Sequence, residues 1–96
     1  MSKYEVMYIL RPTLDEAGKA EVMETLHGVI TSNGGTITNV DDWGLKELAY
    51  QIDDMTKAYY VVITIEADAA CVAEFDRRSR IHSQVVRHLT VNLDKQ

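Results

Sequence analysis

Cysteine and proline are almost absent from this 96-residue sequence, which has one of each. The single cysteine, Cys71, cannot form a disulfide within the chain, so a fold held together by disulfides is excluded. No apolar run approaches the ~20 residues that a membrane-spanning helix needs. The opening segment MSKYEVMYIL is interrupted by Glu5 and is not followed by a small-residue cleavage site, so it does not fit a signal peptide. We therefore expect one cytosolic domain spanning residues 1–96.

Positive charge is also scarce, because ten Lys and Arg residues against fifteen Asp and Glu residues give a net charge of −5. Such a balance argues against non-specific binding to nucleic acid. The charges are unevenly distributed: residues 1–75 carry 5 basic and 13 acidic side chains (−8), whereas residues 76–96 carry 5 and 2 (+3). The basic cluster RRSR at 77–80 either contributes to a phosphate contact or ends a helix, where cations complement the dipole.

Hydrophobic periodicity predicts four strands and two helices. The segments 3–10 and 57–66 carry apolar side chains on both faces, as expected for the central strands of a sheet. Thr13 and Glu16 fit a capping box for the first helix, and Asp68 can cap the second. In chain order, the predicted elements are a strand at 3–10, a helix at 14–32, a strand at 36–52, a turn at 53–56, a strand at 57–66, a helix at 69–80 and a strand at 84–93.

The order βαββαβ predicts a ferredoxin-like α+β fold, with a four-stranded antiparallel sheet and two helices on one face. The other face of the sheet is then left without helices. Apolar residues gathered on such a face indicate a partner surface, although scattered surface hydrophobic residues are common. The residues expected there are Met7, Ile9, Tyr60 and Val62.

The segment DDWGLKELAYQI, residues 41–52, alternates like a strand but changes phase. Trp43 and Leu45 share one parity, whereas Leu48 and Tyr50 share the other. A β-bulge between Leu45 and Leu48 would explain this, since it places one extra residue opposite the neighbouring strand. The segment is predicted to be an edge strand, where charged side chains also discourage unwanted strand pairing.

No motif for catalysis or for a cofactor is present in the sequence. Gly34-Gly35 precedes a strand, whereas a phosphate-binding loop follows one. The three histidines and Cys71 do not have the spacing of a metal site. Tyr60 is the one aromatic residue expected on the open face, which argues against the base stacking of RNA-recognition domains. An acylphosphatase-like activity would need an arginine-bearing anion loop after the first strand, which this chain does not provide.

Several segments that occur in order resemble one family. They are KYEVMYILRP, NGG, DDWGLKELAYQI, KAYYVV and IHSQVVRHLTV, and they span residues 3–93. Together they resemble the bacterial ribosomal protein S6 family. The resemblance implies a structural, non-enzymatic protein of the small ribosomal subunit, with no cofactor, membrane or small-molecule substrate. It also implies binding to the central domain of 16S rRNA as a pair with small-subunit ribosomal protein number eighteen, called protein eighteen below.

The resemblance implies partner-binding residues as well. Charged positions around the tryptophan–glycine pair face protein eighteen in the family, and here they are Asp41, Asp42, Lys46 and Glu47. Trp43 is either an interface anchor or a partly buried packing residue. The two aspartates are expected to attract a basic partner. Family members commonly have two basic residues where this chain has Lys46-Glu47, so Glu47 reverses a charge. Together with the open-face residues named above, these five complete the expected partner surface.

Phosphate contacts are expected from Lys3, Arg80 and Arg87. Lys3 opens a central strand, Arg80 ends the second helix and Arg87 matches a marker of the family. An acidic protein can bind RNA when a basic partner brings much of the positive charge. The alternative hypothesis is a free-standing ferredoxin-like module that senses a ligand or self-associates through its open sheet face.

Overall fold

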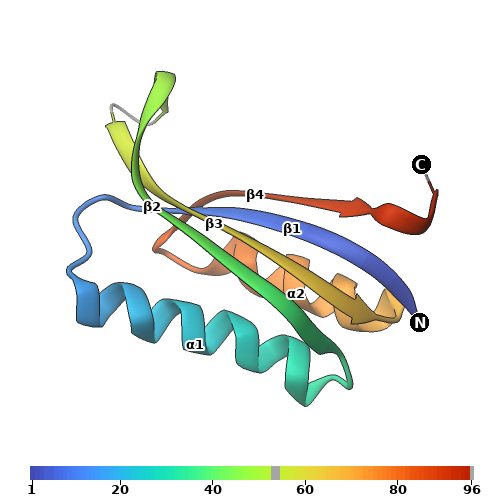
Figure 1. Cartoon of the computed structure of the whole chain (residues 1–96). Helices are drawn as coiled ribbons and strands as arrows, with labels where there is room; N and C mark the ends of the chain where they lie inside the picture. Colours follow the sequence, from blue (N-terminus) through green and yellow to red (C-terminus); the bar gives the residue numbers. More distant parts are fainter. Residues whose placement is uncertain (53–54, 96) are drawn as a thin grey trace.

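The computed structural model describes residues 1–52 and 55–95, and its elements follow the predicted order. They are β1 (Ser2–Leu10), α1 (Glu16–Ser32), β2 (Thr36–Ile52), β3 (Met55–Ala67), α2 (Ala69–Ile81), β4 (Val85–Asn92) and a short 3₁₀ turn, η1 (Leu93–Lys95). The strands form one antiparallel sheet in the order β2-β3-β1-β4. Both helices cover one face of the sheet and leave the other open (Figure 1). The predicted ferredoxin-like α+β fold is confirmed.

The hydrophobic core lies between the sheet and the two helices. Alternate residues of the central strands point toward the helices, because side chains along a strand alternate between its faces. The buried residues that form this core are Val6, Tyr8, Leu10, Val22, Leu26, Val29, Ile30, Val61, Ile63, Ile65, Ala67, Cys71 and Phe75. The sheet is therefore firmly packed on the helix side, and its open side is left for other contacts.

The first helix begins at a different cap from the one predicted. Asp15, not Thr13, is the N-cap of α1, and its carboxylate accepts a hydrogen bond from the Gly18 amide at 2.7 Å. Thr13 is instead part of a turn in which the Leu14 amide donates to the Arg11 carbonyl, so it lies too early in the chain to cap the helix. The cap predicted for α2 is confirmed, because Asp68 accepts from the Cys71 amide.

Strand β2 contains a bulge at Trp43. Asp42 pairs with Val61 and Gly44 pairs with Tyr60, so Trp43 has no partner in β3. The register is then regular to Glu47 and shifts again between Glu47 and the end of the strand. The phase change therefore starts before the predicted position between Leu45 and Leu48. Gly44 explains the location, because its φ of +73° is rarely adopted by residues with a side chain.

A second bulge, in β4, resolves the mixed facing of that strand. Val85 pairs with Leu10 and Arg87 pairs with Ile9, so Val86 is the extra residue. Val85 consequently packs against the core, whereas Arg87 and Leu89 face the open side although all three share one sequence parity. A pattern based on strict alternation cannot place all of these residues on one face.

Beyond the end of β1, strands β2 and β3 continue as a two-stranded ribbon. The last pair between β1 and β3 is Leu10 with Tyr59, whereas β2 and β3 remain paired through Lys46 with Ala58 and beyond. The ribbon rises on the open side of the sheet (Figure 1). Of the predicted turn at 53–56, residues 53 and 54 lie outside the described residues, and Met55 and Thr56 belong to β3.

Candidate partner and nucleic-acid interface

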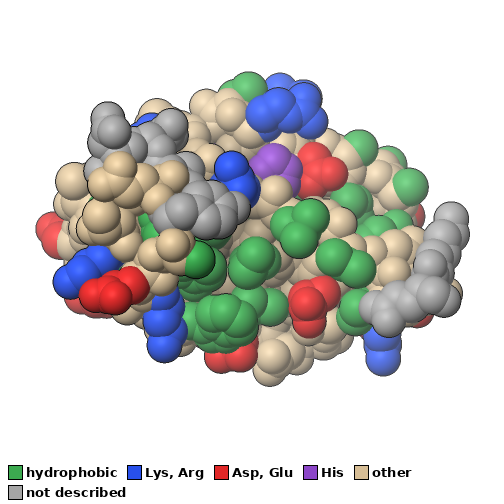
Figure 2. Space-filling view, turned by 90° about the horizontal axis from the view of Figure 1, so that it is seen from above, with side chains coloured by type: hydrophobic (Ala, Val, Ile, Leu, Met, Phe, Trp, Pro, Cys, Tyr) green, Lys and Arg blue, Asp and Glu red, His purple; other side chains and the backbone are tan. Residues whose placement is uncertain are grey.

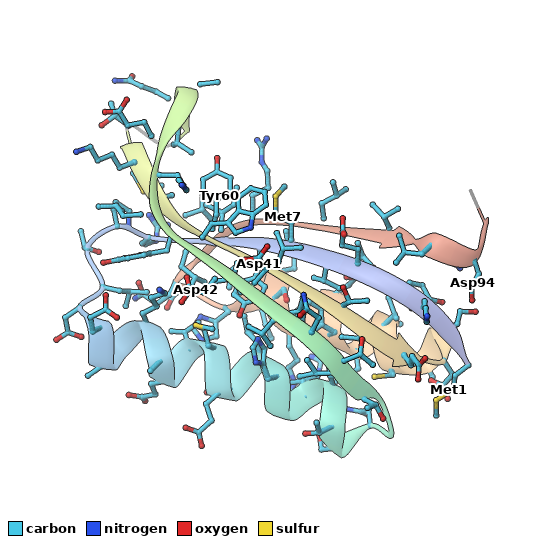
Figure 3. The ribbon with its side chains drawn as sticks, in the orientation of Figure 1. Met1, Met7, Asp41, Asp42, Tyr60 and Asp94 are labelled. Carbon is cyan, nitrogen blue, oxygen red and sulfur yellow. The ribbon has the colours of Figure 1, made fainter. Side chains whose placement is uncertain are left out.

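Apolar side chains from β1 and β3 meet on the open face of the sheet. In the register, Met7 is opposite Val62 and Ile9 is opposite Tyr60, so the four residues predicted for this face are direct neighbours. Met7 and Tyr60 project from the side away from the helices (Figure 3). Figure 2 shows hydrophobic side chains gathered across this face, with charged side chains around them. Ile9 is only 4% exposed, so it supports the surface from beneath and adds no area to it.

Trp43 covers part of this face by stacking on Tyr60. The two ring centroids are 6.1 Å apart and the ring planes differ by 9°. The bulge places Trp43 beside this ring, because Trp43 is the extra residue directly before Gly44, the partner of Tyr60. Trp43 remains 46% exposed. It is therefore a packed aromatic residue that still presents a large apolar surface.

An open hollow of ≈ 660 Å³ lies beside this stack, where the ribbon leaves the sheet. Its walls come from Asp41, Asp42, Trp43, Lys46, Glu47, Ala49 and Tyr60. All five residues predicted around the tryptophan–glycine pair thus line one depression together with Tyr60. The sequence analysis missed Ala49, and the available signal was its small side chain in the middle of a strand otherwise rich in long residues.

The two aspartates beside Trp43 have different surroundings. Asp41 is exposed and pairs with Val62, which puts it on the open face. Asp42 pairs with Val61 of the core and forms an ion pair with Lys19 of α1, with 2.7 Å between Nζ and Oδ2. Asp42 is thus matched by a lysine of this chain, whereas Asp41 faces the open side. That both aspartates attract a basic partner stays a prediction.

Lys19 was missed as a buried residue. Its side chain is 7% exposed, and its Nζ lies 5.0 Å from the centroid of the Tyr59 ring. The helical spacing contained the signal, because Lys19 lies three residues before Val22 and seven before Leu26 on the buried stripe of α1. A lysine at such a position needs a counter-ion, and Asp42 provides it.

The other oxygen of Asp42 is bound as well. Its Oδ1 accepts a hydrogen bond from the Gly44 amide at 2.9 Å. Burial acts to raise the pKa of Asp42, but the hydrogen bonds from Lys19 and Gly44 and the charge of Lys19 together lower this pKa below its usual value. The carboxylate is therefore held ionised between helix α1 and the bulge.

The three basic residues predicted to contact phosphate do not form one cluster. Arg87 is opposite Ile9, six residues along β1 from Lys3, which corresponds to roughly 20 Å along the strand. The Lys3 amide donates to the Asp94 carboxylate at 3.1 Å, so a negative charge lies close to Lys3. Arg80 is exposed near the end of α2, in the layer of the helices. Lys3 and Arg87 both face the open side of the sheet but at opposite ends of β1, because Lys3 shares the facing of Met7 and Arg87 pairs with Ile9.

Neighbouring charges limit what the basic cluster on α2 can bind. Glu74 accepts hydrogen bonds from Arg77 at 2.7 and 2.9 Å and from Arg78 at 3.1 Å. These two arginines, through hydrogen bonds first and charge second, lower the pKa of Glu74 to about 2. Their charge is thus partly matched within the helix by Glu74.

Residues 1–52 and 55–95 contain no group of three or more His, Cys, Asp or Glu side chains placed to hold a metal ion. No helix in the same residues is both long enough and apolar enough to cross a membrane.

The sheet order, the two helices on one face and the apolar open face define a ferredoxin-like α+β protein that presents a sheet surface. The sequence model of the family described as Ribosomal protein S6 matches residues 3–92. The chain therefore belongs to the ribosomal protein S6 family, as the sequence segments indicated. It is similar to the crystal structure of 30S ribosomal protein S6 from Thermotoga maritima, with a TM-score of 0.90 and 25% sequence identity over 95% of this chain and 86% of that one.

Membership of this family identifies the chain as a structural protein of the small ribosomal subunit and not an enzyme. The prediction of a non-enzymatic ribosomal protein is confirmed at this level.

Proposed function

We propose that this chain binds 16S rRNA as a pair with protein eighteen and presents the hollow around Trp43 to that protein. The observation that carries the proposal is the Trp43–Tyr60 stack, because it holds a half-exposed indole in a fixed position beside an open depression. Rigid aromatic residues of this kind dominate binding energy at protein interfaces. The ribosomal protein S6 family membership makes a ribosomal component the natural partner.

The charges around the hollow favour a basic protein partner over direct contact with RNA. Asp41 and Glu47 line the depression together with Lys46, while Asp42 is already paired with Lys19, and the chain as a whole carries −5. Phosphate would be repelled here, whereas lysine and arginine side chains of a partner would be attracted. Such a partner would also supply the positive charge that RNA binding needs.

Direct contact with RNA is assigned to the basic residues away from the hollow. Arg87 borders the open face on β4, and Arg80 lies on the exposed surface of α2. An RNA strand that follows protein eighteen to the β4 side of the sheet would meet Arg87 first. Lys3 is kept as a weaker candidate, because Asp94 lies beside it.

The proposal is tested by measuring the binding of an rRNA central-domain fragment to this chain alone, to protein eighteen alone and to the mixture. We expect weak binding by the chain alone and at least about tenfold tighter binding of RNA by the pair than by protein eighteen alone. Tight RNA binding by the chain without protein eighteen would contradict the paired mechanism.

Sedimentation of a cell extract tests the alternative of a free-standing module. A ribosomal protein should migrate with the small subunits, and this position should persist in a salt wash that removes loosely bound proteins. A chain that remained at the top of the gradient would instead support ligand sensing or self-association through the open face.

A further inference from the structure

Lys19 lies on the helix side of the sheet, yet it is connected to Trp43 on the open side through one carboxylate. Lys19 Nζ donates to Asp42 Oδ2 at 2.7 Å, and the Gly44 amide donates to Asp42 Oδ1 at 2.9 Å. Asp42 and Gly44 are the two residues that flank the unpaired Trp43. A hydrogen bond between Asp42 and Gly44 thus spans the bulge, and Lys19 of α1 holds the accepting carboxylate in place.

The lysine in turn is fixed by its surroundings. Its side chain is 7% exposed and its ammonium group lies 5.0 Å from the centre of the Tyr59 ring. The Tyr59 hydroxyl donates to the Leu14 carbonyl, just before α1 begins, at 3.1 Å. A buried ammonium group that is paired and stacked in this way has few alternative positions, because moving it would leave its charge without a partner.

We propose that Lys19 is a positioning residue for Trp43: it orients the Asp42 carboxylate, which holds the Gly44 amide and thereby fixes the bulge that seats the indole on Tyr60. This inference rests on the proposed function in one respect, namely that the seated indole is what the partner binds. It assigns a contribution to partner affinity to a side chain on the opposite side of the sheet from the proposed interface.

The chemistry of Asp42 makes the connection specific. Two separate carboxylate oxygens are used, one for Gly44 and one for Lys19. Asparagine has one acceptor oxygen, so Asp42→Asn can keep one of the two hydrogen bonds but not both. Asp42→Asn and Lys19→Met should therefore loosen the position of Trp43 to a similar extent. The double variant should loosen it no further, because both changes break the same chain of contacts.

Lys19→Met is a suitable first test because the variant should fold. Methionine has a similar length, favours helices and packs well in an apolar stripe. The Asp42 side chain that loses its counter-ion is 38% exposed and can be hydrated. Lys57→Met is the matched control, since it removes an exposed lysine charge opposite Glu47 but leaves the contacts of Lys19, Asp42 and Gly44 in place.

The chain has one tryptophan, so its fluorescence reports on Trp43 alone. In Lys19→Met we expect acrylamide quenching of Trp43 fluorescence to increase. The increase should be at most about twofold, because the side chain is already 46% exposed and can at most become fully exposed. The Gly44 amide resonance should shift toward that of an amide bonded to water. If the stacked position is then occupied about one-fifth of the time, affinity for protein eighteen falls about fivefold. Lys19→Arg, which keeps a cation near the Tyr59 ring, should restore part of both signals.

The outcomes separate this inference from the proposed function. A folded Lys19→Met protein with wild-type quenching and an unshifted Gly44 amide would overturn the inference, and Trp43→Ala would still test the interface on its own. Increased quenching with unchanged partner affinity would support the positioning of Trp43 by Lys19 but overturn Trp43 as the residue that the partner binds. A change of equal size in Lys57→Met would overturn the inference, because the effect would then follow from loss of any lysine charge.

Discussion

Replacing Trp43 with alanine should weaken binding of protein eighteen by about two orders of magnitude while leaving the fold intact. A tryptophan side chain can bury up to ~250 Å², and 46% of Trp43 is still exposed in the free chain. About 115 Å² therefore remains for a partner to cover. At ~25 cal/mol per Å² this area corresponds to about 3 kcal/mol, or roughly 100-fold in Kd.

The loss within the chain itself should be smaller. Trp43 already stacks on Tyr60, and such aromatic pairs contribute about 0.5–1.5 kcal/mol beyond the area they bury. Because Trp43 lies at a bulge in an edge strand, its removal opens no cavity in the core between sheet and helices. Thermal unfolding of the variant should therefore remain cooperative, with a midpoint a few degrees lower.

Leu45→Ala is the matched control for this prediction. Leu45 is 48% exposed and lies two residues along the same strand, but it pairs with Tyr59, whose hydroxyl reaches the segment before α1 on the helix side. We expect Leu45→Ala to change partner affinity by less than about twofold. Isothermal titration of both variants with protein eighteen decides the matter. Trp43 is not the interface anchor if its alanine variant binds within about threefold of the wild type, or if the Leu45 variant loses as much affinity.

The remaining predictions concern charge and pH. Asp41→Asn should slow association with protein eighteen, most clearly at low salt where screening is weak, and stopped-flow rates that are equal across a salt series would remove Asp41 from the interface. Replacing both Lys46 and Glu47 with apolar residues should extend the hydrophobic edge of β2 and raise self-association in sedimentation, whereas a monomeric variant would refute edge protection. Burial lowers the pKa of His27, so the folded chain binds fewer protons than the unfolded chain. The free energy of unfolding, measured in urea, should therefore decline as pH falls from 7.5 through about 6.5 toward 5.5. His27→Gln should remove this component of the pH dependence. Glutamine at Lys3, Arg80 or Arg87 should weaken RNA binding by the pair and reduce the slope of its salt dependence by about one unit. Unchanged slopes in all three variants would exclude these residues as phosphate contacts.

Much of the fold could be predicted from the sequence because the relevant signals are local. The central strands β1 and β3 have apolar residues on both faces: one face packs against the helices, and the other forms the apolar open face. Asp68 could be assigned as a cap because the helix it starts follows directly. The first cap was assigned wrongly, since Thr13 and Asp15 are both suitable residue types and the choice depends on the turn between Arg11 and Leu14.

The bulges were harder to locate because they are properties of pairs of strands. The alternation in β2 indicated a phase change, but its position depends on which residues of β3 lie opposite, and only the pairing identifies Trp43 as the extra residue. The same holds for Val86 in β4, whose partner strand is far away in the sequence. Gly44 carried a usable local signal, since a glycine inside a strand often marks a bulge.

The residues that line the hollow could be predicted from the sequence, but the ion pair and hydrogen bonds among them could not. The residues around the tryptophan–glycine pair do line one hollow with Tyr60. The role of Asp42 could not be foreseen, because its counter-ion, Lys19, lies 23 residues earlier and on another element. A charged residue inside an apolar helical stripe indicates a buried partner somewhere, but periodicity alone does not identify it.

The central claim is that protein eighteen binds the open sheet face at the hollow around Trp43. The most direct measurement is an NMR titration of isotope-labelled chain with unlabelled protein eighteen, recording backbone amides, methyl groups and the Trp43 indole. We predict the largest shifts at the indole, at the Met7 methyl group and at amides of Asp41 and Tyr60, with small changes along the exposed side of α1. Shifts concentrated on α1 or α2, with the indole resonance unmoved at saturation, would contradict the claim.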